Sequence, residues 1–301
     1  GSRHLTRLLD PRTGRRRTLP RPDYAVSPDR RSALGADIAR IQRLRPGNGY
    51  QGVRDPNEDE PTPRDSGVYR LDLETGASQL VVSIAELAAV PFEHGDFSDA
   101  THYVNHLLVA PGGERFVFLH RWRPRPDSPG ADHYRQVGGF GTRMFTAGLD
   151  GTDLYVLDPS GYTSHFIWDD PEHITAWTRP AGRAPGFYRF RDRTREVEPV
   201  GAGVMTRNGH NTYVPGTGNA WILNDTYPSQ GPREQTLYLF HEPTGRKVLL
   251  GRFHEPPEYA GEWRVDLHPR SSRDGTRVCI DSTHGGQGRQ MYLLDVQRII
   301  G

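Results

Sequence analysis

Residues 210–251 read HNTYVPGTGNAWILNDTYPSQGPREQTLYLFHEPTGRKVLLG, and this stretch decides the fold class. It holds four short runs rich in apolar and β-branched residues, separated by turns that contain Gly, Pro, Asn or Asp. Runs of about four to eight residues with such turns between them are typical of antiparallel strands in a meander. The stretch therefore predicts one four-stranded sheet.

The same order of runs and turns recurs along the chain. A four-stranded unit that repeats in this way is typical of a β-propeller blade. We expect an all-β fold, a single β-propeller domain over residues 1–301, with five blades and the two outer strands of a partial one. The partial blade covers 4–18, and the blades cover 23–83, 103–159, 164–200, 210–251 and 266–296. Within the first blade, ALGADIARI (33–41) is interpreted as a strand, and only SIAELAAV (83–90) has a helical pattern.

Composition excludes several other classes of protein. The 301 residues include 34 glycines and 25 prolines, too many turn-forming residues for a helical bundle, while 10% aromatic residues exclude wholesale disorder. No apolar stretch reaches the roughly 18 residues of a membrane span, so we expect a soluble protein that does not bind membranes. A net charge of +1 argues against nucleic-acid binding. The single cysteine, Cys279, favours a reducing compartment, and we expect a cytoplasmic protein.

Histidines recur at one position of the repeat. When the first strands of successive blades are aligned on their turns, the same point is occupied by His106, His165, His210 and His268. Because equivalent positions of successive blades face the same mouth of a propeller, we expect these imidazoles to converge. Each histidine alone could instead be structural and bond a neighbouring blade. Four together favour a metal or acid–base site.

Other polar residues are expected at the same mouth. Asp266 lies two residues before His268, so both side chains share one side of an extended strand and could chelate one ion. Asp266 could equally be a solvated residue at the start of a strand. Loops between second and third strands add further polar groups, and a third strand opens with Arg143. These loop residues are His120, Asp225, Tyr227, His284 and Gln287. We expect the substrate to be bound by His106, His120, Tyr227, His284 and Gln287.

The ordered motifs resemble those of the oligogalacturonate lyase family. The motifs are NHLL, FLHRW, GTRMFTAGLDGTDLYVL, SHFIW, GHNTY, DLHP and RDGTRV, which lie within residues 100–300. The resemblance implies a seven-bladed propeller, of which this chain would form part. It also implies one divalent metal ion, typically manganese, and cleavage of uronate oligomers by β-elimination.

The resemblance also implies roles for individual residues. His210 matches a metal-binding histidine, and Asp266-Leu267-His268-Pro269 matches a motif with two metal-binding histidines, so the implied ligands are His210, His268 and Asp266. His165 matches the catalytic base, and Arg143 matches an arginine that contacts the substrate carboxylate. A glutamine ligand of the family has no counterpart, because residues 262–264 read Glu-Trp-Arg.

From these observations we expect a metal-dependent lyase that acts on an acidic oligosaccharide. The cofactor would be manganese, with magnesium, calcium or zinc as alternatives. Two other functions stay open. One is a non-catalytic propeller of the TolB type that binds a protein or a glycan, and the other is an epimerase or hydrolase of acidic sugars. The sequence leaves the oligomeric state undetermined.

Overall fold

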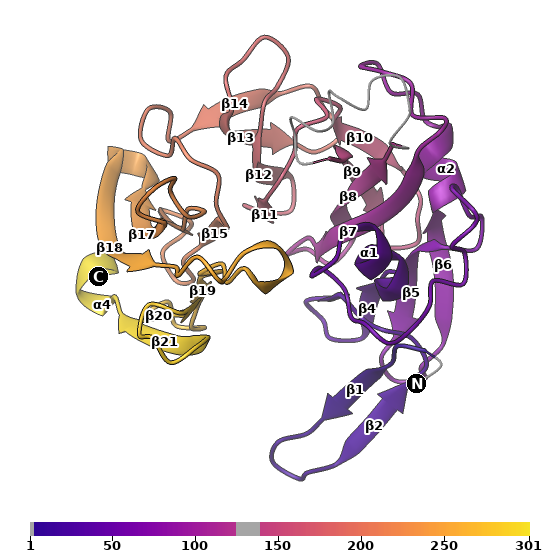
Figure 1. The fold of residues 1–301 in the computed structure, drawn as a ribbon, viewed down its shortest axis with the longest axis horizontal. Helices are drawn as coiled ribbons and strands as arrows, with labels where there is room; N and C mark the ends of the chain where they lie inside the picture. Colours follow the sequence, from indigo (N-terminus) through magenta and orange to yellow (C-terminus); the bar gives the residue numbers. More distant parts are fainter. Residues whose placement is uncertain (1–2, 125–138) are drawn as a thin grey trace. The chain divides into compact units, whose positions relative to one another are not determined.

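The structure is a computed structural model that describes residues 3–124 and 139–301. The chain divides into two compact units, Gly1–Thr163 (unit 1) and Ser164–Gly301 (unit 2), and each is described by itself (Figure 1). The sheets of both units are antiparallel and follow chain order, so the all-β prediction is confirmed. In the described part of the chain, every helix is too short or too polar to cross a lipid bilayer.

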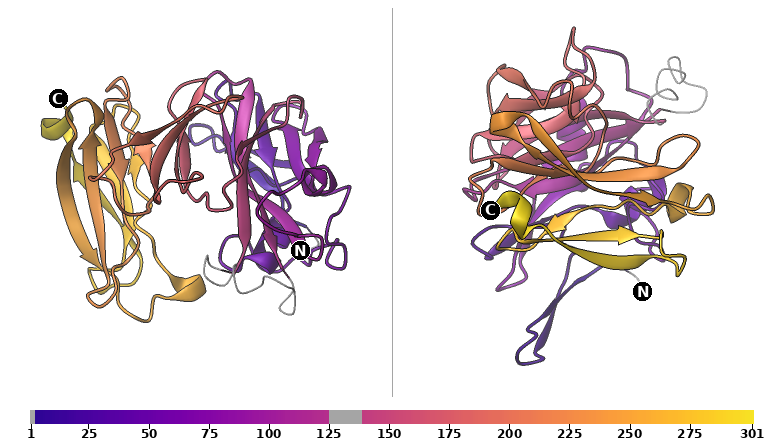
Figure 2. Two further views of the ribbon diagram at one scale, coloured as in Figure 1. Left: turned by 90° about the horizontal axis from the view of Figure 1, so that it is seen from above. Right: turned by 90° about the vertical axis from the view of Figure 1, so that its left-hand side faces the viewer.

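The described part of unit 1 consists of a hairpin and two four-stranded sheets. The hairpin, β1 (Thr6–Leu9) and β2 (Arg16–Leu19), projects from the rest of the unit in Figures 1 and 2. The strands of the first sheet are β3 (Ala25–Val26), β4 (Ser32–Gly35), β5 (Gly67–Asp72) and β6 (Ser78–Ser83). Those of the second are β7 (Thr101–Val109), β8 (Arg115–Arg123), β9 (Gly141–Gly148) and β10 (Tyr155–Asp158).

Two helices lie in the described part of unit 1, and one of them corrects the sequence prediction. Residues 33–41 were expected as one strand, but β4 ends at Gly35 and α1 (Ile38–Leu44) follows. The reason is the spacing of Ile38, Ile41 and Leu44, which places three buried side chains on one helical face. The helix α2 (Ile84–Ala89) lies within the segment with the helical pattern and begins with a Ser83–Glu86 capping box.

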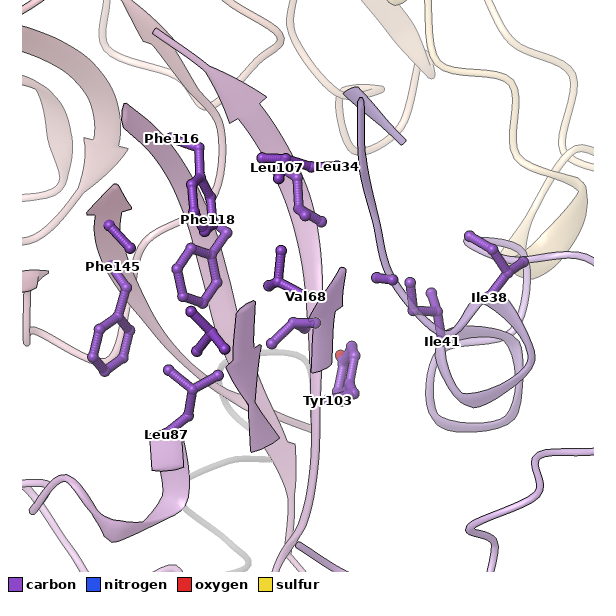
Figure 3. Packing of buried hydrophobic residues seen from close by; sticks show 14 of the residues in the cluster. Leu34, Ile38, Ile41, Val68, Leu87, Tyr103, Leu107, Phe116, Phe118 and Phe145 are labelled. Atoms are coloured by element: carbon purple, nitrogen blue, oxygen red, sulfur yellow. The ribbon is translucent and has the colours of Figure 1, made fainter. Parts of the chain in front are cut away.

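The core of unit 1 lies where the strands of β7–β9 meet the first sheet and both helices. Phe116, Phe118 and Phe145 stack in a row, with ring centroids 5.3 and 5.7 Å apart. Leu87 of α2 and Ile41 of α1 pack against the same cluster (Figure 3). Burial of this apolar surface is the main stabilising contribution to the unit.

Unit 2 consists of three sheets. The strands of the first are β11 (Phe166–Trp168), β12 (His173–Thr178), β13 (Gly186–Arg191) and β14 (Val197–Val200). Those of the second are β15 (Thr212–Tyr213), β16 (Trp221–Asn224), β17 (Glu234–His241) and β18 (Arg246–His254). The third holds β19 (Arg270–Ser271), β20 (Arg277–Ser282) and β21 (Gln290–Asp295). Short helices are η1 (Glu242–Thr244), η2 (Gly261–Trp263) and α4 (Gln297–Ile300).

The first strands of the second and third sheets are shorter than the sequence predicted. Runs 210–215 and 266–271 were expected as strands, but β15 and β19 contain only two residues each. The amides of His210 and His268 do not join a strand ladder. Both donate to the carboxylate of Asp225 instead, at 2.6 and 3.0 Å. A buried acceptor thus replaces the neighbouring strand and ends the pairing.

Candidate acid–base site

Three of the four aligned histidines meet in unit 2. His165, His210 and His268 each lie just before the first strand of their sheet, β11, β15 and β19. The ring centroids of His165 and His210 are 4.2 Å apart, and those of His210 and His268 are 4.0 Å apart. The repeat therefore brings equivalent residues of three successive sheets into direct contact. We call these three residues the histidine cluster.

Asp225 forms hydrogen bonds with two members of the histidine cluster, His210 and His268. It follows β16, is 1% exposed, and accepts the backbone N–H groups of His210 and His268. Its oxygens also lie 2.9 and 3.0 Å from Nδ1 of His210. Burial raises the pKa of this carboxyl, but the hydrogen bonds from His210 outweigh burial and leave the pKa below its ordinary value. Asp225 is therefore ionised at neutral pH.

Gly209 allows the chain to approach Asp225. A Cβ atom at this position would lie 1.9 Å from the backbone oxygen of Asp225. Any larger residue would push the segment that carries His210 away from the carboxylate. Gly209 therefore helps to orient His210.

The hydrogen bonds of His165 determine its tautomer. The amide nitrogen of Asn208 donates to Ser164 Oγ at 3.1 Å, which turns Asn208 Oδ1 toward His165 Nδ1 at 3.0 Å. Nδ1 therefore carries the proton, and the lone pair of Nε2 faces the Tyr227 hydroxyl at 3.1 Å. Tyr227 donates to this nitrogen. In this tautomer, the basic nitrogen of His165 is paired with a phenol.

Arg264 and Asp266 form an ion pair beside the histidine cluster. Nε and Nη2 of Arg264 donate to both oxygens of Asp266, at 2.7 and 2.8 Å. The same guanidinium lies over the ring of Tyr227, 4.9 Å from its centroid. Although the His268 side chain reaches the surface, desolvation and then the nearby His210 lower the pKa of its imidazole to about 4. His268 is neutral at pH 7.

The predicted metal ligands are not assembled as a set. His210 and His268 are in contact, but both oxygens of Asp266 are occupied by Arg264. A guanidinium at this position repels a divalent cation. Among residues 3–124 and 139–301, no three His, Cys, Asp or Glu side chains are grouped so that they could hold an ion. The described residues therefore do not fit the implied three-ligand site.

Arg143 and His120 take part in a buried hydrogen-bond network. Both belong to unit 1 and are at most 1% exposed. Arg143 donates at 2.8 Å to the carbonyl oxygen of Leu87 in α2 and to those of Val90 and Pro91, which follow the helix. Its Nε donates to Nδ1 of His120 at 3.2 Å. Both side chains are thus buried in a hydrogen-bond network, and their assignment to the substrate stays a prediction.

A second buried imidazole continues this network. Nε2 of His120 lies 2.9 Å from Nδ1 of His102, whose Nε2 lies 3.3 Å from the carbonyl of Phe97. Since Arg143 can only donate, the protons of the chain are ordered: Arg143 to His120, His120 to His102, and His102 to Phe97. Burial lowers the pKa of His102 to about 4 and that of His120 well below its ordinary value. Both imidazoles are neutral.

The other residues predicted to bind substrate are His106, His284 and Gln287. His106 lies in β7 of unit 1, with a left-handed backbone (φ 54°) like that of His268 (φ 44°). His284 is exposed, and its Nδ1 lies at hydrogen-bond distance from Ser282 Oγ, 2.9 Å. Its ring is tilted by 43° to that of Tyr292, with the centroids 4.3 Å apart. Gln287 is exposed, and its carbonyl accepts from Gln290. Tyr227 is the predicted substrate-binding residue that does contact the histidine cluster.

The sequence pattern gives no role to Asn208 or Arg264, and it places Asp225 at the mouth of the propeller without a role of its own. Asp225 ends the run WILND, so its place at a strand end was visible, but its bonds to two chain segments were not. Asn208 precedes His210 in NGHN, and this proximity was the one available signal. Arg264 lies in the segment 262–264, where the family's glutamine ligand has no counterpart.

Comparison with known proteins places the fold. No family model matches the sequence, and no curated protein matches it. Among solved structures, TolB from Acinetobacter baumannii matches with a TM-score of 0.53 at 13% identity, over 97% of this chain and 57% of TolB. An oligogalacturonate lyase in complex with manganese matches with a TM-score of 0.51 at 13% identity, over 99% of this chain and 82% of the lyase. The tricorn protease matches with a TM-score of 0.58 at 10% identity, over 98% of this chain and 27% of the protease.

These similarities establish the fold class. The chain has a β-propeller fold, as the repeat predicted. It spans just over half the length of the matched TolB chain and about a quarter of the tricorn chain. At such identities the likeness is one of fold, and a site must be argued from its own residues.

Proposed function

We propose that unit 2 carries an acid–base site that cleaves an acidic oligosaccharide by β-elimination. The observation that supports this most directly is the contact of His165, His210 and His268, with Asp225 and Tyr227 bonded to two of them. The choice of a uronate as substrate comes from the motif resemblance. It agrees with the presence of an oligogalacturonate lyase among the similar structures.

The reaction needs one group that accepts a proton and one that gives a proton. A base removes the proton from C5 of the uronate, and the electron pair of this C–H bond forms the C4–C5 double bond. The C4–O bond breaks with its electrons on the leaving oxygen, which then takes a proton. The C5 proton is weakly acidic unless positive charge offsets the neighbouring carboxylate.

The His165–Tyr227 pair can supply both groups. The Nε2 lone pair of His165 is the base, because Asn208 keeps the proton on Nδ1. The hydroxyl of Tyr227 is the proton donor for the leaving oxygen, since it already donates to this nitrogen. A positioned base contributes about 10²–10⁴-fold to the rate.

The His210–Asp225 pair supplies the electrostatic part. Asp225 orients the His210 ring through Nδ1 and stabilises positive charge on it, as a buried carboxylate does for a catalytic imidazole. A protonated His210 beside the substrate carboxylate would stabilise the enediolate that forms when C5 loses its proton. The described residues do not fit the implied manganese site, so the proposed steps use side chains alone.

The test is the appearance of an unsaturated uronate, followed by its ultraviolet absorbance, when the protein is incubated with oligogalacturonates. His165→Ala should abolish product formation, and His284→Ala, which removes an exposed imidazole outside the histidine cluster, should leave it intact. Failure of the unsubstituted protein to release an unsaturated product from any uronate oligomer would overturn the proposal.

Epimerisation of an acidic sugar is a second candidate, because it starts with the same proton abstraction but returns a proton to the opposite face. The presence of two separate pairs, His165–Tyr227 and His210–Asp225, favours it, since each pair can exchange a proton. Product analysis separates the two reactions: an inverted sugar of unchanged chain length indicates epimerisation.

A further inference from the structure

The segment between β18 and β19 forms a loop that is anchored by hydrogen bonds and leads into the histidine cluster. Glu255, 1% exposed, accepts the N–H of Val265 at 2.8 Å, and Gln235 donates to the carbonyl of Val265 at 2.9 Å. Arg233 ties the other end through the side chain and the carbonyl of Glu255. Both backbone groups of Val265 are thus fixed, and the two residues before it are held in place.

Trp263, at the tip of this loop, has its side chain in solvent. It is 78% exposed, whereas the other four of the chain's five tryptophans are at most 7% exposed. Exposure of an indole leaves a large apolar surface in contact with water, which is unfavourable unless a ligand covers it. A flat aromatic face on a fixed loop suits the C–H face of a sugar ring.

Arg264, the next residue, offers a charge at the same place. Its Nε and Nη2 face Asp266, so Nη1 is directed away from this ion pair. Its guanidinium lies over Tyr227, which donates to His165. A carboxylate bound at Nη1 would therefore be held by a guanidinium that itself contacts Tyr227, one member of the proposed His165–Tyr227 pair.

We propose that Trp263 and Arg264 form a subsite that binds one uronate ring beside the histidine cluster. Trp263 stacks on the ring, and Nη1 of Arg264 binds the ring's carboxylate. The choice of an acidic sugar rests on the proposed function, whereas the stacking surface and the charge rest on the loop itself. The subsite sets specificity and takes no part in the bond-breaking step.

Calorimetric titration with trigalacturonate tests this, with galactotriose as the matched neutral sugar. The His165→Ala background prevents turnover, so binding is measured apart from catalysis. Trp263→Ala should weaken binding of both sugars about tenfold, and Trp263→Phe should restore most of it. Arg264→Gln combined with Asp266→Asn should weaken only the acidic sugar, again about tenfold. Tyr50→Ala, which removes another exposed aromatic ring, should change neither affinity.

Fluorescence gives a second readout, because Trp263 is the exposed tryptophan. Trigalacturonate should protect part of the emission from quenching by acrylamide, and Trp263→Phe should remove this protection. Unchanged affinity in Trp263→Ala, with trigalacturonate still bound by the background protein, would overturn the subsite and leave the proposed function standing. Absence of any binding of trigalacturonate by the background protein would count against the proposed function, and the subsite would fall with it.

Discussion

Nδ1 of His210 lies 2.9 and 3.0 Å from the two carboxylate oxygens of Asp225, and the same carboxylate accepts the backbone N–H of His268 from the next sheet. One buried side chain thus orients an imidazole and joins two sheets of unit 2. Function and folding are coupled at this residue. The coupling explains why β15 and β19 are short.

Asp225→Asn should impair catalysis more than binding. An asparagine has one side-chain oxygen and no negative charge, so the His210 ring loses part of its orientation and its compensating charge. We therefore expect kcat to fall by about 10³-fold. KM should change little, since Asp225 does not face the substrate. Asp281→Asn is the control, because Asp281 is a buried carboxylate in an ion pair with Arg270. Steady-state kinetics of both variants check this, and equal losses in kcat would contradict it.

Gly209→Ala should disrupt the contact between Asp225 and the segment that carries His210. The added Cβ meets the backbone oxygen of Asp225 at 1.9 Å, so one of the two segments must move. We expect a loss of about 2 kcal/mol or more in the free energy of unfolding, together with a loss of activity. Gly186→Ala, where the nearest atom lies at 3.4 Å, is the matched control in unit 2. Similar denaturation midpoints for the two variants would disprove the role of Gly209.

How much of this site was predictable depends on the range of the interactions. Alignment of the repeat predicted that histidines converge, since it needs only the period of strands and turns, and His165, His210 and His268 do meet. The tautomer of His165 was not predictable, because it depends on Asn208, which is distant in sequence.

The same limit applies to the contacts of Arg143. Arg143 lies near the start of β9, close to where the pattern placed it, but its side chain reaches carbonyls at the end of α2 and just after it, some 50 residues earlier in the chain. The place of a residue on a strand follows from local pattern. The partner of its side chain follows from tertiary packing, which no single motif encodes.

Acid should destabilise unit 1 through its buried histidines. The folded-state pKa of His102 is about 4, below the ordinary 6.5, so the unfolded chain binds a proton first as the pH falls. Stability is therefore complete above about pH 6.5 and is lost progressively as the pH falls toward 4. His102 alone should cost about 2 kcal/mol between pH 7 and pH 5. Denaturant titrations at the two pH values measure this loss. His102→Gln should reduce it, whereas a loss of the same size in His102→Gln as in the unsubstituted protein would exclude His102 as its source.

Arg143→Lys should weaken the fold without affecting sugar binding. A lysine keeps the positive charge but cannot donate to three carbonyls and an imidazole from one planar group. Leaving these buried acceptors unpaired should lower the free energy of unfolding by about 2 kcal/mol or more. The affinity for trigalacturonate, measured at a temperature where the variant is folded, should not change. A selective loss of affinity would restore the substrate contact that the sequence resemblance implied.

Asp266→Asn separates the ion pair from the implied metal site. In the structure, Asp266 binds Arg264 with both oxygens, so its removal frees the guanidinium for a substrate carboxylate. We expect KM for an acidic oligosaccharide to fall several-fold, with kcat nearly unchanged. Activity of the unsubstituted protein should persist in a chelator and should not rise on addition of manganese, since Arg264 opposes a cation at this position. The matched control is Asp274→Asn, in an exposed turn of the same unit. If Asp266→Asn instead abolished activity and the unsubstituted protein needed manganese, Asp266 would be a ligand, and the Arg264 pair would have to open when the ion binds.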